Sequence, residues 1–335
     1  MTRLARRLSL HHRSDEPHFD PSQRITEAAH RGKSGRTVRT SLRRQEPVAL
    51  LTPRWSCPQA FLEDVALELA VSEPGVGCRT VNLRPLQGRN CVVAWQFLLR
   101  VLAQLSAQRA DDIRIPTVAE RKGFRLVAQE LLAKAQEQSD IPVALMAHGA
   151  EHLPVDAAED LLLAWESYSS AYPSERRCVL LLGGTANAPA LRGFEGRPVE
   201  LADFGPGETY DMLGRMVGPQ LSGRMTGAAD FTGGVPALVE AIGRHTRLQR
   251  RIDNDEWAML SSAGKIGDEI RGVVDILVSD HRLAARLDQL LPGSPLPMEP
   301  ELDNQLITAG LARRAHELSG AQVCLRAPAI ASLVG

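Results

Sequence analysis

Short apolar runs alternate with helix-like segments along the middle of this chain, and this alternation restricts the fold more than any other feature. The runs have the length of buried strands and lie at residues 47–52, 78–83, 141–147, 177–184 and 197–204. Apolar residues at helical spacing fill the segments between them, at 61–72, 92–105, 123–138 and 155–172. Strands joined by helices form a parallel sheet with both faces covered. We therefore expect an α/β domain over residues 46–204.

The pattern changes after residue 204. Helical patterns and a hairpin follow, at 207–221, 225–251, 257–279 and 313–326. The hairpin turns around Ser319 and Gly320 and comes directly after a helical segment. This order predicts a helical lid over residues 205–252 and a winged-helix domain over 253–335, with its wing in the hairpin.

The turn after the first apolar run is where a protein of this order would bind phosphate. A P-loop there reads GxxxxGK[ST], because glycine backbone N–H groups, a Lys and a hydroxyl hold the phosphates and Mg²⁺. The same eight positions here read Thr52-Pro53-Arg54-Trp55-Ser56-Cys57-Pro58-Gln59. Thr52 and Cys57 replace the glycines, Pro58 replaces the Lys and Gln59 replaces the hydroxyl. We expect a degenerate P-loop.

The third apolar run also ends without the acidic residues that would hold Mg²⁺ and orient a water. His148 and Gly149 occupy those positions, in a degenerate Walker B motif. Glu151 follows two residues later, without a Lys or another Mg²⁺ ligand to work with. We interpret Glu151 as a surface carboxylate.

Two further segments match the motifs of a nucleotide-binding protein more closely. Thr185 follows the fourth run, as a small polar sensor residue that contacts a γ-phosphate would. The segment FTGGVP contains Gly233, Gly234 and Pro236, similar to a GGxP lid helix. With the strand order, the lid and the winged helix, the chain resembles the AAA+-related STAND NTPases and their origin-recognition-like relatives over residues 40–335.

This resemblance implies the fold and the assembly habit of the family. Since the two motifs of an active member are lost, we expect no catalytic residue, no cofactor and no metal. The chain resembles the inactive STAND proteins that accompany other proteins in bacterial conflict systems. We therefore expect a scaffold or adaptor subunit with protein partners, in a homo-oligomer or hetero-oligomer. We expect this chain to lack the repeat-rich sensor that usually follows the winged helix in this family.

Positive charge gathers at the start of the chain. Residues 1–46 contain 11 Lys and Arg against 5 Asp and Glu, although the net charge of the whole chain is -1. Few apolar residues recur there, so we expect a flexible basic arm over residues 1–45. Such an arm is either solvated or docked on an acidic partner or a nucleic acid.

A DNA-binding subunit related to initiators or transposition regulators is the main alternative, using the arm and the winged helix. Its candidate recognition helix, near residues 299–312, carries Glu299, Glu301 and Asp303. Carboxylates beside DNA phosphates are repelled, which disfavours this helix as a DNA reader. The basic stretch 244–251 is the one opposing signal.

A thiol enzyme is a third alternative. Cys57 and His148 are expected at the carboxyl ends of neighbouring strands, where they could act as nucleophile and base. No orienting carboxylate accompanies them in the sequence. The other interpretation of the same positions is a filled cleft, with Trp55 as its plug.

Composition excludes several classes of protein. The five cysteines are scattered and form no CxxC pair, so neither a disulfide framework nor a structural zinc site is expected. No apolar run reaches about 18 residues, and the first residues lack the apolar core of a secretory signal. We expect a cytoplasmic protein without a membrane partner.

Overall fold

The computed structural model describes residues 32–72, 75–105, 119–172, 178–218, 227–249, 265–317 and 320–334. The expected arm up to residue 31 and the start of the expected helix at 257–279 lie outside these ranges. A parallel five-stranded sheet forms the centre, in the order β2-β3-β4-β1-β5. Its strands are β1 (Val48–Leu51), β2 (Gly77–Asn82), β3 (Val143–His148), β4 (Cys178–Gly184) and β5 (Arg197–Glu200).

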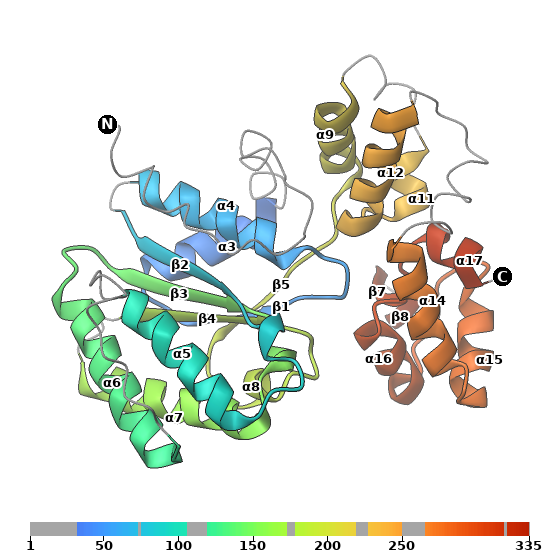
Figure 1. Cartoon of the computed structure of the whole chain (residues 1–335). Coiled ribbons are helices and arrows are strands. Elements are labelled where there is room, and N and C mark those ends of the chain that lie inside the picture. The colour runs from blue at the N-terminus through green and yellow to red at the C-terminus, as the bar shows by residue number, and fades with distance from the viewer. Residues whose placement is uncertain are drawn as a thin grey trace.

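Helices cover both faces of this sheet (Figure 1). One face carries α3 (Gly32–Arg43) and α4 (Pro58–Val71), and the other carries α5 (Cys91–Leu105), α6 (Arg121–Glu137) and α7 (Val155–Ala171). Every residue of β3 and β4 is buried, because successive side chains point into two separate apolar cores. Met146 and Leu181 pack toward α4, and Leu145 and Leu180 pack toward α6 and α7. The expected α/β core is confirmed.

Helix α3 lies in the stretch that we expected to be a flexible arm. Val38 and Leu42, one helical turn apart, are fully buried in the core between α4 and the sheet. The hydroxyl of Ser34 donates a 2.8 Å hydrogen bond to the carbonyl of Glu200 in β5. Two apolar residues among twelve are a weak pattern, but they are sufficient here because small residues let the helix approach the sheet closely.

Three short elements lie on the rim of the sheet: η1 (Arg84–Leu86), η2 (Ala150–His152) and α8 (Pro189–Arg192). After β5 come α9 (Pro206–Val217), α11 (Ala228–Thr232) and α12 (Pro236–Gln249). Leu213, Val239 and Ile242 join α9 and α12 in a small apolar core.

The C-terminal module comprises residues 265–317 and 320–334. Its elements are α14 (Lys265–Leu277), α15 (His281–Leu290), β6 (Leu296–Pro297), α16 (Pro300–Thr308), β7 (Ala312–Glu317), β8 (Gly320–Leu325) and α17 (Pro328–Val334). The three strands form an antiparallel sheet in the order β6-β8-β7. The predicted hairpin is present as β7 and β8, whereas α15 and α17 were not predicted.

None of the five cysteines forms a disulfide, and only Cys178 and Cys324 are buried. None of the helices that the structure describes is long and apolar enough to cross a membrane. Within the same described ranges, no three His, Cys, Asp or Glu side chains are grouped as a metal site requires.

Candidate functional site

The loop from Thr52 to Cys57 joins β1 to α4 at the carboxyl end of the sheet, where ligands bind in open α/β folds. The Thr52 N–H donates to the carbonyl of Gly184 at 2.8 Å. Trp55 and Cys57 have φ of 62° and 49°, in the left-handed region that favours glycine. Cys57 directly precedes α4, and Pro58 is the first residue of that helix. The loop therefore contains glycine-like backbone conformations without glycine residues.

Trp55 is covered by two other parts of the chain. Its side chain packs against the apolar core of the C-terminal module. Its carbonyl accepts a 3.2 Å hydrogen bond from the N–H of Ala237, in the first turn of α12. A Cβ placed on Gly310, between α16 and β7, would lie 3.0 Å from the Trp55 ring. The loop is thus closed by residues distant in the sequence.

Arg326 fixes this arrangement from the end of β8. Only 2% of this residue is exposed. Its Nε and Nη2 donate to the two carboxylate oxygens of Asp203 at 2.8 and 2.5 Å, and its Nη1 donates to the carbonyl of Arg54 at 2.5 Å. Asp203 lies between β5 and α9. One guanidinium therefore connects the loop, the chain after β5 and the C-terminal module.

The motif FTGGVP lies at the same junction. Gly233 and Gly234 have φ of 56° and 73°. A Cβ on Gly234 would lie 1.9 Å from the carbonyl oxygen of Phe204, and one on Gly233 would lie 2.3 Å from that of Arg326. The Phe204 N–H donates to the Gly234 carbonyl at 2.8 Å. Both glycines are required by close backbone approach, and Pro236 starts α12.

The end of β3 carries a neutral imidazole instead of carboxylates. His148 is buried, and burial lowers its pKa to about 4, with a smaller effect from the nearby His152. Gly149 follows with φ of 80° and leads into η2. A neutral His at this place supplies no negative charge for a Mg²⁺ ion.

Glu151 and Thr185 come together at this edge. The Thr185 N–H donates to Oε2 of Glu151 at 3.2 Å. A Cβ on Gly184 would lie 2.8 Å from the same oxygen, so glycine is needed beside it. The sequence predicted a surface carboxylate, and Glu151 is indeed exposed. It also holds the backbone of the sensor-like residue, a contact that we did not predict.

The expected pairing of Cys57 with His148 rested on neighbouring strands, and that expectation is wrong. Strand β4 lies between β1, which precedes Cys57, and β3, which ends at His148. The Cys57 thiol faces the carbonyl of Trp55 at 4.0 Å. The order was missed because β4 follows β3 in sequence but pairs with both β3 and β1.

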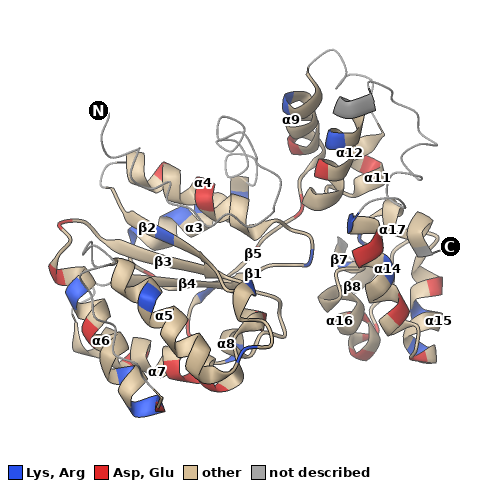
Figure 2. Ribbon diagram, in the orientation of Figure 1, with Lys and Arg blue, Asp and Glu red and all other residues tan. Residues whose placement is uncertain are grey.

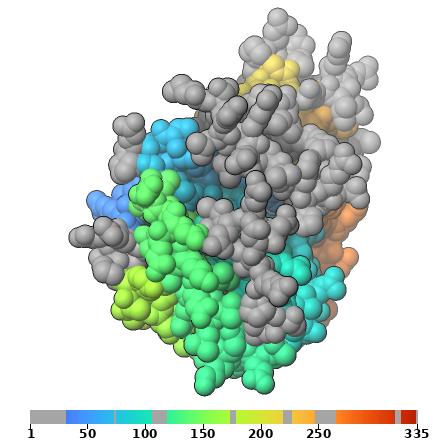
Figure 3. Space-filling model, turned by 60° about the vertical axis from the view of Figure 1, so that its left-hand side comes forward, coloured from blue at the N-terminus to red at the C-terminus, as the bar shows by residue number. Residues whose placement is uncertain are grey.

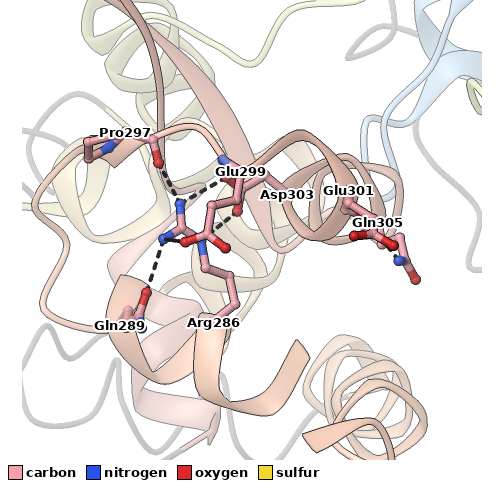
Figure 4. A network of polar contacts seen from close by, with 7 residues as sticks. All are labelled: Arg286, Gln289, Pro297, Glu299, Glu301, Asp303 and Gln305. Atoms are coloured by element: carbon pink, nitrogen blue, oxygen red, sulfur yellow. Dashed lines mark hydrogen bonds and ion pairs between the residues drawn. The ribbon is translucent and has the colours of Figure 1, made fainter. Parts of the chain in front are cut away.

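The acidic helix of the C-terminal module is less negative than its sequence indicates. In the network of Figure 4, Arg286 of α15 donates to both carboxylate oxygens of Asp303 at 2.9 Å, and to Glu299 at 2.8 Å. Asp303 is fully buried. Its hydrogen bonds and charge raise the pKa of Arg286, which stays protonated. One Arg therefore pairs with two of the three acids near α16 and offsets one of their negative charges.

Arg326, Asp203 and Arg286 had no place in the sequence prediction, since none belongs to a motif. For Arg326 a signal existed, because it is the one charged residue in the apolar segment from Val323 to Val334. A charged residue in such a segment is buried only with a partner. The sequence could not identify that partner, which lies 123 residues away.

The architecture is similar to that of a solved structure, although the sequence comparisons found no match. No protein-family model and no curated protein sequence matches the chain. A Walker-type ATPase of Pyrococcus abyssi has a similar structure, with a TM-score of 0.62 and 14% identity over 91% of this chain and 95% of that one. This likeness, with the parallel sheet, shows a P-loop-NTPase-like α/β fold.

Two other solved structures are less similar. The Cdc6 protein of Pyrobaculum aerophilum has a TM-score of 0.45 and 12% identity, over 95% of this chain and 94% of that one. A STAND protein with a tetratricopeptide repeat sensor, from Pyrococcus horikoshii, has a TM-score of 0.37 and 13% identity. That match covers 89% of this chain and 41% of the other.

Proposed function

We propose that this chain is a non-catalytic, AAA+/STAND-like pseudo-ATPase that serves as a scaffold or adaptor subunit in a larger assembly. One observation carries the proposal: the loop in the place of a P-loop is bound by the chain's own Arg326 and covered by its own C-terminal module. The carbonyls of Arg54 and Trp55 accept these hydrogen bonds, so the loop is held in place by contacts within the chain.

Phosphate binding in such a loop depends on backbone N–H groups that point at the ligand. Pro53 and Pro58 have no N–H group. The N–H groups of Thr52 and Ser56 donate to the carbonyls of Gly184 and Pro53. No Lys lies between residues 52 and 59 to neutralise a phosphate. The loop therefore offers few of the groups that a triphosphate needs.

Hydrolysis would further require a bound Mg²⁺ and an oriented water. The edge of β3 provides His148, which is neutral at pH 7, and Gly149. The carboxylate of Glu151 accepts a hydrogen bond from Thr185. The contact between Glu151 and Thr185 supports a structural role for these two residues.

The proposed scaffold role rests on the contacts that hold the parts of the fold together. Arg326 holds three parts of the fold together through its contacts with Asp203 and Arg54. Such a molecule presents fixed surfaces to partners without a nucleotide cycle. As part of the same proposal, residues 205–252 form a lid and 253–335 a winged helix. The partners are proteins of a bacterial defence assembly, as the resemblance to inactive STAND proteins implies.

An ATPase assay on the purified full chain tests the absence of catalysis. We expect no release of phosphate above the level of Glu151→Gln and Thr185→Ala variants, because neither residue acts on a nucleotide. Turnover that both substitutions abolish would refute the proposal. Their use also separates activity of this chain from that of a contaminating ATPase, which the substitutions would not change.

The scaffold role is tested by whether partner retention depends on nucleotide. A tagged chain would be recovered with its bound proteins, and half of the sample treated with a nucleotide-degrading enzyme. We expect the same proteins at the same stoichiometry in both halves. Release of the partners on nucleotide removal would show a nucleotide-gated switch instead.

A further inference from the structure

The outward face of α3 has an unusual composition. At 100° per residue, Lys33, Arg36, Thr37, Thr40, Arg43 and the following Arg44 fall on one side of the helix axis. The opposite side carries the buried Ser34, Val38, Ser41 and Leu42. The six outward positions, which we call the α3 face, contain four cations, two hydroxyl groups and no apolar side chain.

The charge of the α3 face is not compensated within the described parts of the chain. Helix α3 contains no acidic residue. Arg39, on its flank, pairs with Glu68 of α4 at 2.5 Å. Lys33, Arg36, Arg43 and Arg44 are exposed, and no ion pair joins them to another described residue. Figure 2 shows the positive charge of α3, and part of this helix reaches the surface at the left edge of Figure 3.

The α3 face is held rigidly on the α/β domain. Val38 and Leu42 are anchored in the core, and Ser34 is bonded to β5. At the first turn, the Gly32 N–H donates to Glu208 of α9 at 3.4 Å. The cations therefore project from a fixed helix, so the side chains lose conformational entropy when a ligand binds but the backbone does not.

The spacing of these cations suits a regular polyanion. From Lys33 to Arg44 the helix rises about 16 Å, at about 1.5 Å per residue. Each strand of a nucleic acid duplex carries one phosphate per about 3.4 Å of axis, so this length corresponds to about five phosphates. Arg side chains and Thr hydroxyls are typical phosphate contacts.

An acidic protein is the competing ligand for a basic face. Stable protein interfaces are centred on buried aromatic or aliphatic anchors, and the α3 face has none. Interfaces with nucleic acids are more polar and more positive than those with proteins. We propose that the α3 face binds the phosphate backbone of a nucleic acid duplex independently of base sequence, as an activity beyond the scaffold role.

Fluorescence anisotropy with a labelled 20-base-pair duplex of random sequence tests the proposal on the full chain. Four phosphate contacts predict that the logarithm of the association constant falls with log salt at a slope of about −3.6. The double charge reversal Arg36→Glu with Arg43→Glu should weaken binding at least tenfold and reduce this slope by about 2. Two duplexes of different sequence should bind within a factor of about three.

The matched control reverses two exposed cations elsewhere. Lys122 and Lys134 lie on α6, across the sheet from α3. Lys122→Glu with Lys134→Glu changes the net charge equally and should leave binding within a factor of about two. Thermal unfolding of both double variants at the wild-type midpoint shows that the fold is intact.

Three results would overturn the proposal. These are no binding of the duplex at 50 mM salt, an equal loss of affinity in both double variants, and wild-type binding by the α3 variant. Binding of poly-glutamate but not of the duplex would identify an acidic protein as the ligand instead. The ATPase assay is independent of all these outcomes, so the scaffold proposal and this one fail separately.

Discussion

Replacing Arg326 by Met tests the junction that closes the candidate site. Met keeps most of the buried volume and removes the donors to Asp203 and to the Arg54 carbonyl. Breaking a buried, bidentate ion pair from one side costs about 3–5 kcal/mol, because the other charge stays buried without its partner. Asp203 is only 15% exposed, so solvent compensates little of this loss. We expect the free energy of unfolding to fall by about 3–5 kcal/mol.

Urea unfolding followed by circular dichroism measures this loss. Arg282→Met is the matched control, since Arg282 pairs with Glu301 on the surface of the same C-terminal module, where the side chains are 55% and 76% exposed. Such surface pairs contribute about 0–1 kcal/mol. In the Arg326→Met variant, Trp55 should also become solvated before global unfolding. This appears as a fluorescence red shift that an added Trp55→Phe substitution removes. Equal losses in the two Arg variants would refute the role of Arg326.

Three further predictions concern the same region. Gly234→Ala should destabilise the chain by about 3 kcal/mol or more, because its Cβ would meet the Phe204 carbonyl at 1.9 Å. Gly207→Ala is the control, with no atom within 4 Å of its Cβ, and unchanged or higher stability is expected in the same urea titration. Gly184→Ala should displace Glu151 from Thr185, which the chemical shift of the Thr185 amide would report; an unchanged shift contradicts this contact. His148, whose pKa in the folded chain is about 4 against 6.5 unfolded, favours unfolding when protonated. Stability should therefore fall by about 3 kcal/mol between pH 7 and pH 4, and His148→Gln should remove most of that dependence; an equal fall in the variant refutes it.

The α/β core could be predicted from sequence because local patterns determine it. Strands buried on both faces, such as β3 and β4, consist of continuous apolar runs. The missing glycines and Lys of the loop after β1 are also visible directly. The sequence does not show which conformation the loop takes without these residues. Trp55 and Cys57 still take left-handed conformations, and Trp55 is held there by contacts with α12 and the C-terminal module.

Contacts between distant residues account for what sequence could not predict. The pair of Arg326 and Asp203 joins positions 123 residues apart, and neither belongs to a recognisable motif. Helix α3 contains only Val38 and Leu42 as large apolar residues, so its packing against the sheet left little periodicity. The number of acids near α16 overstates the exposed negative charge, because Asp303 is buried and paired with Arg286. In each case the tertiary partner determines the role of the residue.

Calorimetric titration of the full chain with ATP and ADP in the presence of Mg²⁺ tests the central proposal most directly. The protein concentration should be high enough to detect a dissociation constant of roughly 100 μM, equivalent to about −5.5 kcal/mol. We predict no saturable heat with either nucleotide, because the loop after β1 lacks a P-loop Lys, is bound by Arg326 and packs through Trp55 against the C-terminal module. Saturable binding of Mg²⁺-ATP that strengthens in the Arg326→Met variant would contradict a non-nucleotide scaffold. It would show that the junction gates a functional nucleotide site.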